Sequence, residues 1–105
     1  MKSILENESK LKQKALNALK KVIDPELNAN IVDLGLIYDL KVEKDGVNVL
    51  MTLTYIGCPL GNFLVFEIED KLKKAGFKNV NVNLTFDPPW TPERMNDKLR
   101  KKFGI

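Results

Sequence analysis

The chain has 105 residues, of which 44% are apolar and 30% are charged, and its formal net charge at pH 7 is +3. This length supports one domain with a modest core, and the composition is typical of a soluble globular protein. One cysteine and no histidine exclude an internal disulfide, Ser-His-Asp or Cys-His catalysis and histidine-ligated zinc.

Apolar residues recur at helical spacing near the N-terminus and predict a first helix over about residues 8–23. Pro25 disfavours helical backbone at the residue before it, so we expect this helix to end near Asp24. Residues 26–33 show no clear period and are predicted to form a loop. From Leu36 the period becomes two, which predicts a strand. Its two faces would carry Leu36, Tyr38, Leu40 and Val42 on one side and Ile37, Asp39, Lys41 and Glu43 on the other.

Asp45-Gly46 predicts a hairpin turn, because a type I′ turn needs positive φ at both central positions. The second strand would place Val47, Val49, Met51 and Leu53 on one face and Asn48, Leu50, Thr52 and Thr54 on the other. A second helix is predicted to end at Gly76, with an apolar stripe formed by Leu60, Leu64, Ile68, Leu72 and Ala75.

A third strand is predicted from the alternation of Val80, Val82, Leu84 and Phe86 with Asn81, Asn83 and Thr85. A proline-rich loop over residues 87–92 follows it. Thr91 and Pro92 then have the residue types of an N-cap and first helical residue. The last helix would pack through Met95, Leu99 and Phe103.

The three strands share one apolar face, which helices must cover. We therefore expect one α+β domain over residues 1–105, a two-layer sandwich of order α-β-β-α-β-α with a small three-stranded mixed sheet and helices on one face. The pattern does not show where the third strand inserts. No apolar run approaches the roughly 20 residues that cross a bilayer. Residues 1–6 also lack a signal-peptide core, so we expect a cytoplasmic protein.

The segment from Thr54 to Cys58 ends the second strand and leads into the second helix. Pro59 favours a helix start, which would put Cys58 at or near the N-cap. There, unpaired amide groups and the helix dipole stabilise a thiolate, the form of cysteine that binds metal or attacks an electrophile. A free cysteine that only fills space in the core is the alternative.

Two other segments stand out. In Asp24-Pro25-Glu26-Leu27, two carboxylates flank a rigid proline, although turn chemistry alone accounts for this pattern. Trp90 lies in the proline-rich loop, where a tryptophan more often plugs the edge of a core than forms a binding platform.

The order of these segments resembles a known family, DUF59, also called MIP18-like or SufT-like. The resemblance extends from the first helix to Phe103-Gly104-Ile105. It rests on Asp24-Pro25-Glu26-Leu27, on residues 31–37 (Ile-Val-Asp-Leu-Gly-Leu-Ile), on Met51-Thr52-Leu53-Thr54 through Cys58-Pro59, and on Phe86-Asp87-Pro88-Pro89-Trp90-Thr91.

The resemblance implies an iron–sulfur cluster assembly domain-like fold and an accessory role in iron–sulfur protein maturation. It also implies a functional site formed by Asp24, Glu26, Leu27, Thr54 and Cys58. One departure is that many members have a second threonine and then proline where this chain has Tyr55 and Ile56. The role of that second threonine therefore does not transfer.

A stably housed cluster generally needs about four protein ligands, mostly thiolates, and this chain has one cysteine. We therefore expect no stable cofactor in the monomer. Nothing in the spacing of the residues identifies a substrate pocket, so we also expect no enzymatic activity. A cluster or iron would be bound transiently through Cys58, or shared between two subunits of a homodimer. The expected partners are assembly scaffolds or carriers and client apo-proteins, with no nucleic acid and no membrane.

Three alternatives remain open at this point. The PaaD branch of the family matures a multicomponent oxygenase, but it carries a Cys-rich C-terminal segment that this chain lacks. A KH-like RNA-binding module would need a Gly-x-x-Gly loop, and Gly57-Cys-Pro-Leu-Gly61 is one residue too long and lacks basic residues. An enzyme with Cys58 as nucleophile would need Asp24, Glu26 or a lysine as base.

Overall fold

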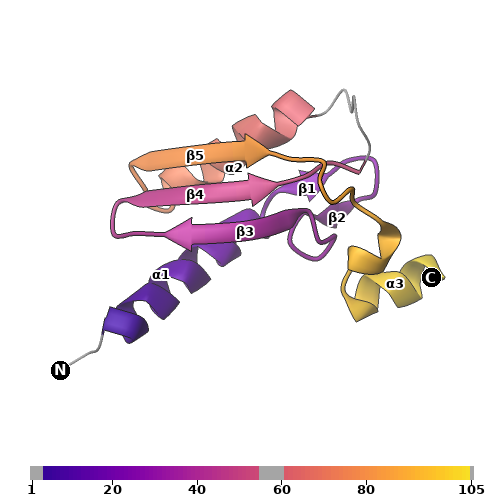
Figure 1. The fold of residues 1–105 in the computed structure, drawn as a ribbon, viewed down its shortest axis with the longest axis horizontal. Coiled ribbons are helices and arrows are strands. Elements are labelled where there is room, and N and C mark those ends of the chain that lie inside the picture. Colours follow the sequence, from indigo (N-terminus) through magenta and orange to yellow (C-terminus); the bar gives the residue numbers. More distant parts are fainter. Residues whose placement is uncertain (1–3, 55–60, 105) are drawn as a thin grey trace.

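The computed structural model of the chain describes residues 4–54 and 61–104. Three helices, five strands and one short 3₁₀ turn form its regular structure in these residues (Figure 1). In chain order they are α1 (Ile4–Leu19), β1 (Ile23–Asp24), β2 (Ala29–Asn30), β3 (Ile37–Val42), β4 (Gly46–Met51), α2 (Gly61–Lys74), β5 (Asn79–Leu84), the 3₁₀ turn η1 (Pro92–Arg94) and α3 (Asp97–Phe103).

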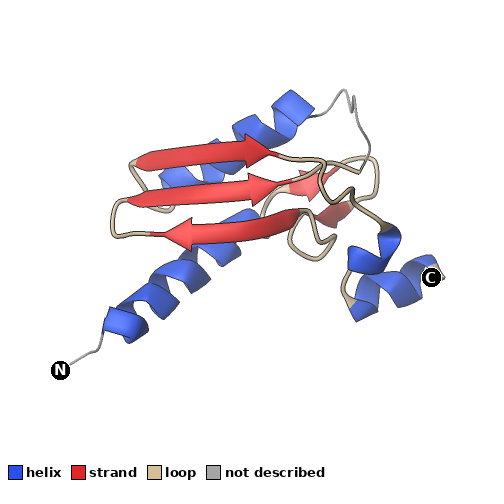
Figure 2. Ribbon diagram, in the orientation of Figure 1, coloured by secondary structure: helices blue, strands red, loops and turns tan. Residues whose placement is uncertain are grey.

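The main sheet has the order β3-β4-β5, with β3 antiparallel and β5 parallel to the central strand β4. Helices α1 and α2 lie side by side behind one face of this sheet (Figure 2). The predicted two-layer α+β fold with a small mixed sheet is confirmed, and the unassigned third strand pairs with the second. Helix α3 does not cover the sheet; it lies at the end of the molecule away from the N-terminus (Figure 1).

Helix α1 ends at Leu19, earlier than the predicted residue 23. The next backbone N–H groups, of Lys21 and Val22, donate to carbonyls three residues back, which tightens the last turn. The chain then pairs β1 with β2 as a separate two-stranded sheet, whereas the sequence predicted the end of the first helix at β1 and a loop at β2. Two-residue strands are too short to produce a readable hydrophobic period.

A bulge in β3 corrects the predicted faces of this strand. Ile37 pairs with Met51, whereas Asp39 pairs with Leu50, so Tyr38 is the extra residue. As a result Ile37 packs against the core. The hydroxyl of Tyr38 instead donates to the carbonyl of Pro88 at 2.9 Å. The prediction that Tyr38 faces the core and Ile37 the opposite side is therefore wrong.

Strand β4 follows its predicted pattern, since Val47, Val49 and Met51 are all buried in the core. The prediction for Thr52 is wrong, because this side chain is fully buried and does not lie on a polar sheet face. The strand ends at Met51, and the N–H of Thr52 instead donates to the carbonyl of Leu36 at 2.9 Å. The alternation of buried and exposed side chains therefore ends with the strand at Met51, and the next residue, Thr52, is also buried.

Helix α2 buries Leu64, Ile68 and Leu72, as predicted. Gly76 follows the helix with φ of 110°, and its N–H donates to the carbonyl of Lys73. A positive φ at this position is typical of glycine that ends a helix. The prediction that Gly76 terminates the helix is confirmed.

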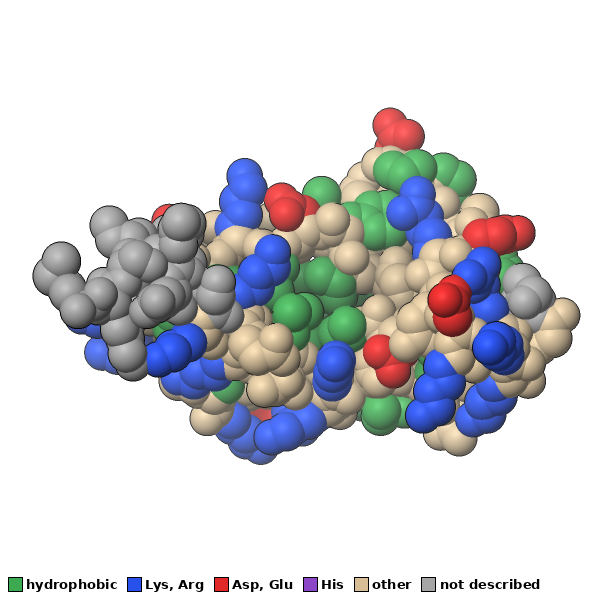
Figure 3. Space-filling view, turned by 90° about the horizontal axis from the view of Figure 1, so that it is seen from below, with side chains coloured by type: hydrophobic (Ala, Val, Ile, Leu, Met, Phe, Trp, Pro, Cys, Tyr) green, Lys and Arg blue, Asp and Glu red, His purple; other side chains and the backbone are tan. Residues whose placement is uncertain are grey.

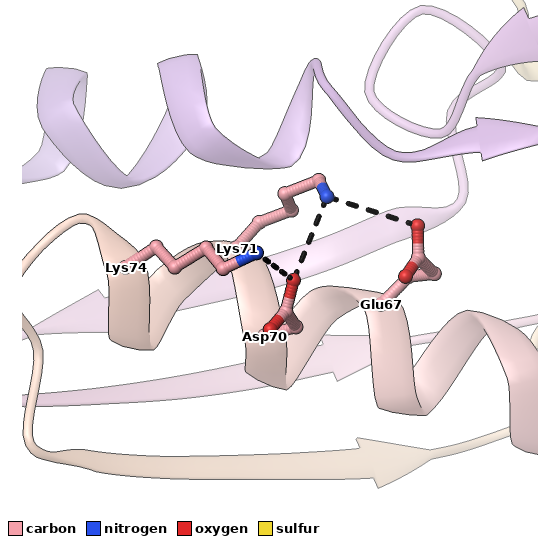
Figure 4. A network of polar contacts seen from close by, with 4 residues as sticks. All are labelled: Glu67, Asp70, Lys71 and Lys74. Atoms are coloured by element: carbon pink, nitrogen blue, oxygen red, sulfur yellow. Dashed lines mark ion pairs between the residues drawn. The ribbon is translucent and has the colours of Figure 1, made fainter.

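An ion-pair network lies on the surface of α2 (Figure 4). The Nζ of Lys71 lies 3.9 Å from Glu67 and 3.6 Å from Asp70, and the Nζ of Lys74 lies 3.2 Å from Asp70. The hydrogen bond from Lys74 lowers the pKa of the Asp70 carboxyl below its ordinary value. Exposed pairs of this kind contribute little to stability.

The C-terminal segment also differs from its prediction. Thr91 and Pro92 begin the 3₁₀ turn, whereas α3 begins later and is capped by Asn96, whose side chain accepts the N–H of Leu99 at 2.9 Å. The predicted N-cap is therefore wrong, because the better-placed cap lies five residues further on. Met95 and Leu99 are buried as predicted, and Phe103 is 40% exposed.

Lysine and arginine side chains gather at the end of the molecule where α3 lies and along the rim formed by α1 (Figure 3). Hydrophobic side chains fill the hollow between them on the same face (Figure 3). Three of the basic residues lie in the last turn of α3, where they interact favourably with the helix dipole. Within the described residues, no helix has both the length and the apolar character needed to cross a bilayer.

Candidate functional site

The turn between β1 and β2 is organised by Asp24. This carboxylate is 2% exposed, and its Oδ1 accepts the N–H groups of Glu26 at 2.8 Å and Leu27 at 3.4 Å. The backbone carbonyl of Asp24 also accepts the N–H of Asn28 at 2.7 Å. A buried acceptor with such partners holds the turn in one conformation. Asp24 is therefore a structural element of the predicted site.

The other two predicted residues in this turn face different ways. Leu27 is half-buried and packs against the core, which anchors the tip of the turn. Glu26 is exposed, so its carboxylate is accessible from solvent. Of the two carboxylates that flank Pro25, one builds the turn and the other is presented on the surface.

Thr54 and Cys58 belong to the connection between β4 and α2. Thr54 is half-buried and is the last described residue before the helix. Cys58, and with it the predicted N-cap position and the departure at Tyr55, lies outside the described residues. A group of three or more potential metal-ligating carboxylates, cysteines or histidines does not occur among residues 4–54 and 61–104.

The two flanks of this connection touch each other. Gly61, at the start of α2, is buried, and a Cβ on it would lie 3.0 Å from Cδ1 of Leu53. Leu53 is itself 5% exposed. The turn between β1 and β2 and the end of β4 lie in the same half of the molecule's long axis, away from the N-terminus (Figure 1).

Two of the sequence motifs, residues 31–37 and 86–91, are joined by one hydrogen bond, and a second bond lies directly beside them. The indole Nε1 of Trp90 donates to the carbonyl of Leu34 at 2.7 Å, and the hydroxyl of Tyr38 donates to that of Pro88. Trp90 also packs against the core. These contacts favour the interpretation of Trp90 as a plug over that of a binding platform.

The sequence did not indicate a further contact at this junction. The guanidinium of Arg94 lies over the ring of Tyr38, 4.6 Å from its centroid. Arg94 also approaches Gly35 through its backbone, since a Cβ on Gly35 would lie 2.2 Å from the carbonyl oxygen of Arg94. The only sequence signal for this packing was the glycine itself, which lies in an otherwise apolar segment.

Replacing Trp90 by phenylalanine is expected to lower the free energy of unfolding by about 1–2 kcal/mol, because the part-buried carbonyl of Leu34 loses its donor. Tyr38→Phe removes a comparable bond at an exposed position and should cost no more than about 0.5 kcal/mol. Urea denaturation of both variants measures the difference. Equal decreases in the free energy of unfolding would show that the hydrogen bond from Trp90 contributes no more to stability than the one from Tyr38.

The chain was compared with known proteins. A family model described as "Iron-sulfur cluster assembly protein" matches residues 12–84. The "Fe-S protein maturation auxiliary factor YitW" of Bacillus subtilis is 39% identical over 100 residues, covering 93% of this chain and 98% of that protein.

Two further proteins extend this similarity. The "Fe-S protein maturation auxiliary factor SufT" of Staphylococcus aureus is 38% identical over 86 residues, which cover 80% of this chain and 98% of the relative. The crystal structure of a DUF59 domain from Bacillus anthracis superposes with a TM-score of 0.88 at 33% identity, covering 96% of this chain and 98% of that one. The similarity therefore includes both sequence and fold over nearly the whole length.

Proposed function

The chain belongs to the family of iron–sulfur cluster assembly proteins, and on that basis we propose that it is an accessory factor that helps to deliver clusters to client apo-proteins. Its role lies in iron–sulfur cluster assembly, as the names of its relatives indicate. These relatives are named as maturation factors, and we propose a delivery role without enzymatic turnover. The cluster is then cargo that passes through the protein.

The observation that supports a defined hand-off point best is the contact between Leu53 and Gly61. Both residues are buried, so the two ends of the stretch that holds Cys58 lie close together in the fold. We propose that this arrangement keeps the thiol in one region of the molecule, where a partner can meet it.

We propose a ligating role for two of the five site residues and a positioning role for two others. The thiolate of Cys58 ligates iron transiently, and the exposed carboxylate of Glu26 is a second, harder ligand or a contact for the partner. Asp24 and Leu27 position the turn that carries Glu26. Thr54 ends the described stretch that leads to Cys58.

One thiolate per chain explains why the ligation would be brief or shared. A cluster generally takes about four ligands, so the remaining ones come from a scaffold, from the client or from a second copy of this chain. Release is then easy, because no single partner supplies the full set. This property suits delivery better than storage.

Deletion of the gene, followed by assays of iron–sulfur enzymes under iron limitation, tests the proposal in the cell. We expect lower client activities that are restored by the wild-type gene and not by Cys58→Ala. Immunoblots of both proteins and of the clients provide the control for abundance. Unchanged client activities in the deletion strain would contradict the assembly role, and full rescue by Cys58→Ala would contradict the role of the thiol.

A further inference from the structure

A groove of about 710 Å³ runs between α1 and α2 on the side of the helices away from the sheet. Among the described residues that line it there is no carboxylate, and five are lysines: Lys10, Lys14, Lys21, Lys71 and Lys74. The small side chains of Ala18 and Ala75 also line the groove. It therefore combines a high positive charge with room for close approach to the backbone of both helices.

The lysines are arranged along the groove. Lys10 and Lys14 are four residues apart and lie on one stripe of α1, and Lys21 follows in the turn after the helix. On the opposite wall, Lys71 extends from α2 toward α1 (Figure 4). Both walls thus direct ammonium groups at the same space.

Several of these ammonium groups are held in position. The Nζ of Lys14 lies over the ring of Phe77, 5.3 Å from its centroid. Lys71 and Lys74 are held by the ion pairs with Glu67 and Asp70. Exposed pairs of this kind are weak, so Lys71 and Lys74 can exchange them for carboxylates of a ligand at little cost.

We propose that this groove docks an acidic α-helical segment of a partner protein. The lysine stripes complement carboxylates on both flanks of such a helix, and the alanines accept its small apolar residues. Within the residues that line the groove there is no aromatic ring for base stacking and no arginine for bidentate phosphate recognition. This composition favours a protein helix over RNA.

This docking surface goes beyond the proposed function, because it needs neither Cys58 nor a cluster. A fluorescein-labelled 20-residue helical peptide, with glutamates on both flanks of an Ala/Leu stripe, is the probe. Fluorescence anisotropy should show saturable binding that weakens as salt screens the charges. The same peptide with glutamine in place of glutamate should bind at least tenfold more weakly.

The groove variant Lys14→Gln/Lys21→Gln should lower the affinity for the acidic peptide by about tenfold, the equivalent of about 1.4 kcal/mol. The matched variant Lys41→Gln/Lys44→Gln removes the same charge from exposed positions outside the groove and should change the affinity less than twofold. Thermal unfolding of both variants checks that the fold is retained.

Amide chemical shifts of the wild-type protein locate the binding site independently of any variant. We expect the peptide to perturb residues 10–21 and 71–75. Absence of saturable binding, shifts centred on another surface, or equal effects of the two lysine variants would each overturn the proposal. Tighter, groove-dependent binding of a 20-nucleotide poly(U) RNA would overturn the choice of a helix as the ligand.

Discussion

Replacing Gly35 by alanine is expected to lower the free energy of unfolding by about 3 kcal/mol or more. Two costs combine at this position. Gly35 has φ of 78°, which disfavours an L side chain by about 1–2 kcal/mol. The new Cβ would also lie 2.2 Å from the carbonyl oxygen of Arg94 and 2.8 Å from its carbonyl carbon. Both contacts are with backbone atoms, which cannot rotate away.

Gly104→Ala provides a matched control for the Gly35 variant. Gly104 has φ of 74°, yet among the described residues other than its chain neighbours no atom lies within 4 Å of the Cβ that alanine would add. This variant should lose only the cost of the backbone conformation, about 1–2 kcal/mol. Urea denaturation of both variants separates the two contributions. Equal decreases in the free energy of unfolding would show that the backbone at Arg94 moves away from Gly35 at no cost, which would contradict close packing between them.

Replacing Asp24 by alanine is expected to lower the free energy of unfolding by about 1–3 kcal/mol. The N–H groups of Glu26 and Leu27 would lose the buried oxygen that they share. Asp24→Asn keeps an oxygen at that position and should cost clearly less. Chemical denaturation of both variants measures the stability difference.

The same pair of variants tests the role of Asp24 in function. If Asp24 only positions the turn, Asp24→Asn should retain most of the client maturation in the cell, whereas Asp24→Ala should lose it. Glu26→Gln is the informative companion, because Glu26 is exposed and the variant should affect function; chemical denaturation of this variant separates that effect from any change in stability. Loss of maturation in Asp24→Asn at unchanged stability would instead indicate that the carboxylate is a ligand.

The main elements could be predicted because their hydrophobic periods are long. Leu64, Ile68 and Leu72 repeat over three turns of α2, and Val47, Val49 and Met51 alternate through β4. The predictions failed where a single residue breaks the period. The bulge at Tyr38 reverses the assignment of two side chains, and no local pattern marks it.

The motifs of the sequence could be recognised but not sorted by role. Trp90, Gly35 and Asp24 turn out to carry structural contacts: an indole hydrogen bond, a close backbone approach and a buried turn acceptor. Such roles depend on partners far away in the sequence, including Leu34 for Trp90 and Arg94 for Gly35. The lysine groove was missed for the same reason, since its two walls are about 50 residues apart.

Transfer of a cluster in vitro tests the hand-off through Cys58 most directly. A [4Fe–4S]-loaded donor protein and an apo-client are mixed anaerobically, and client activity is followed over time with and without this protein. We expect faster transfer with wild-type protein and no acceleration with Cys58→Ala, whose fold is checked by thermal unfolding. Equal acceleration by wild type and Cys58→Ala would contradict a hand-off through the thiol.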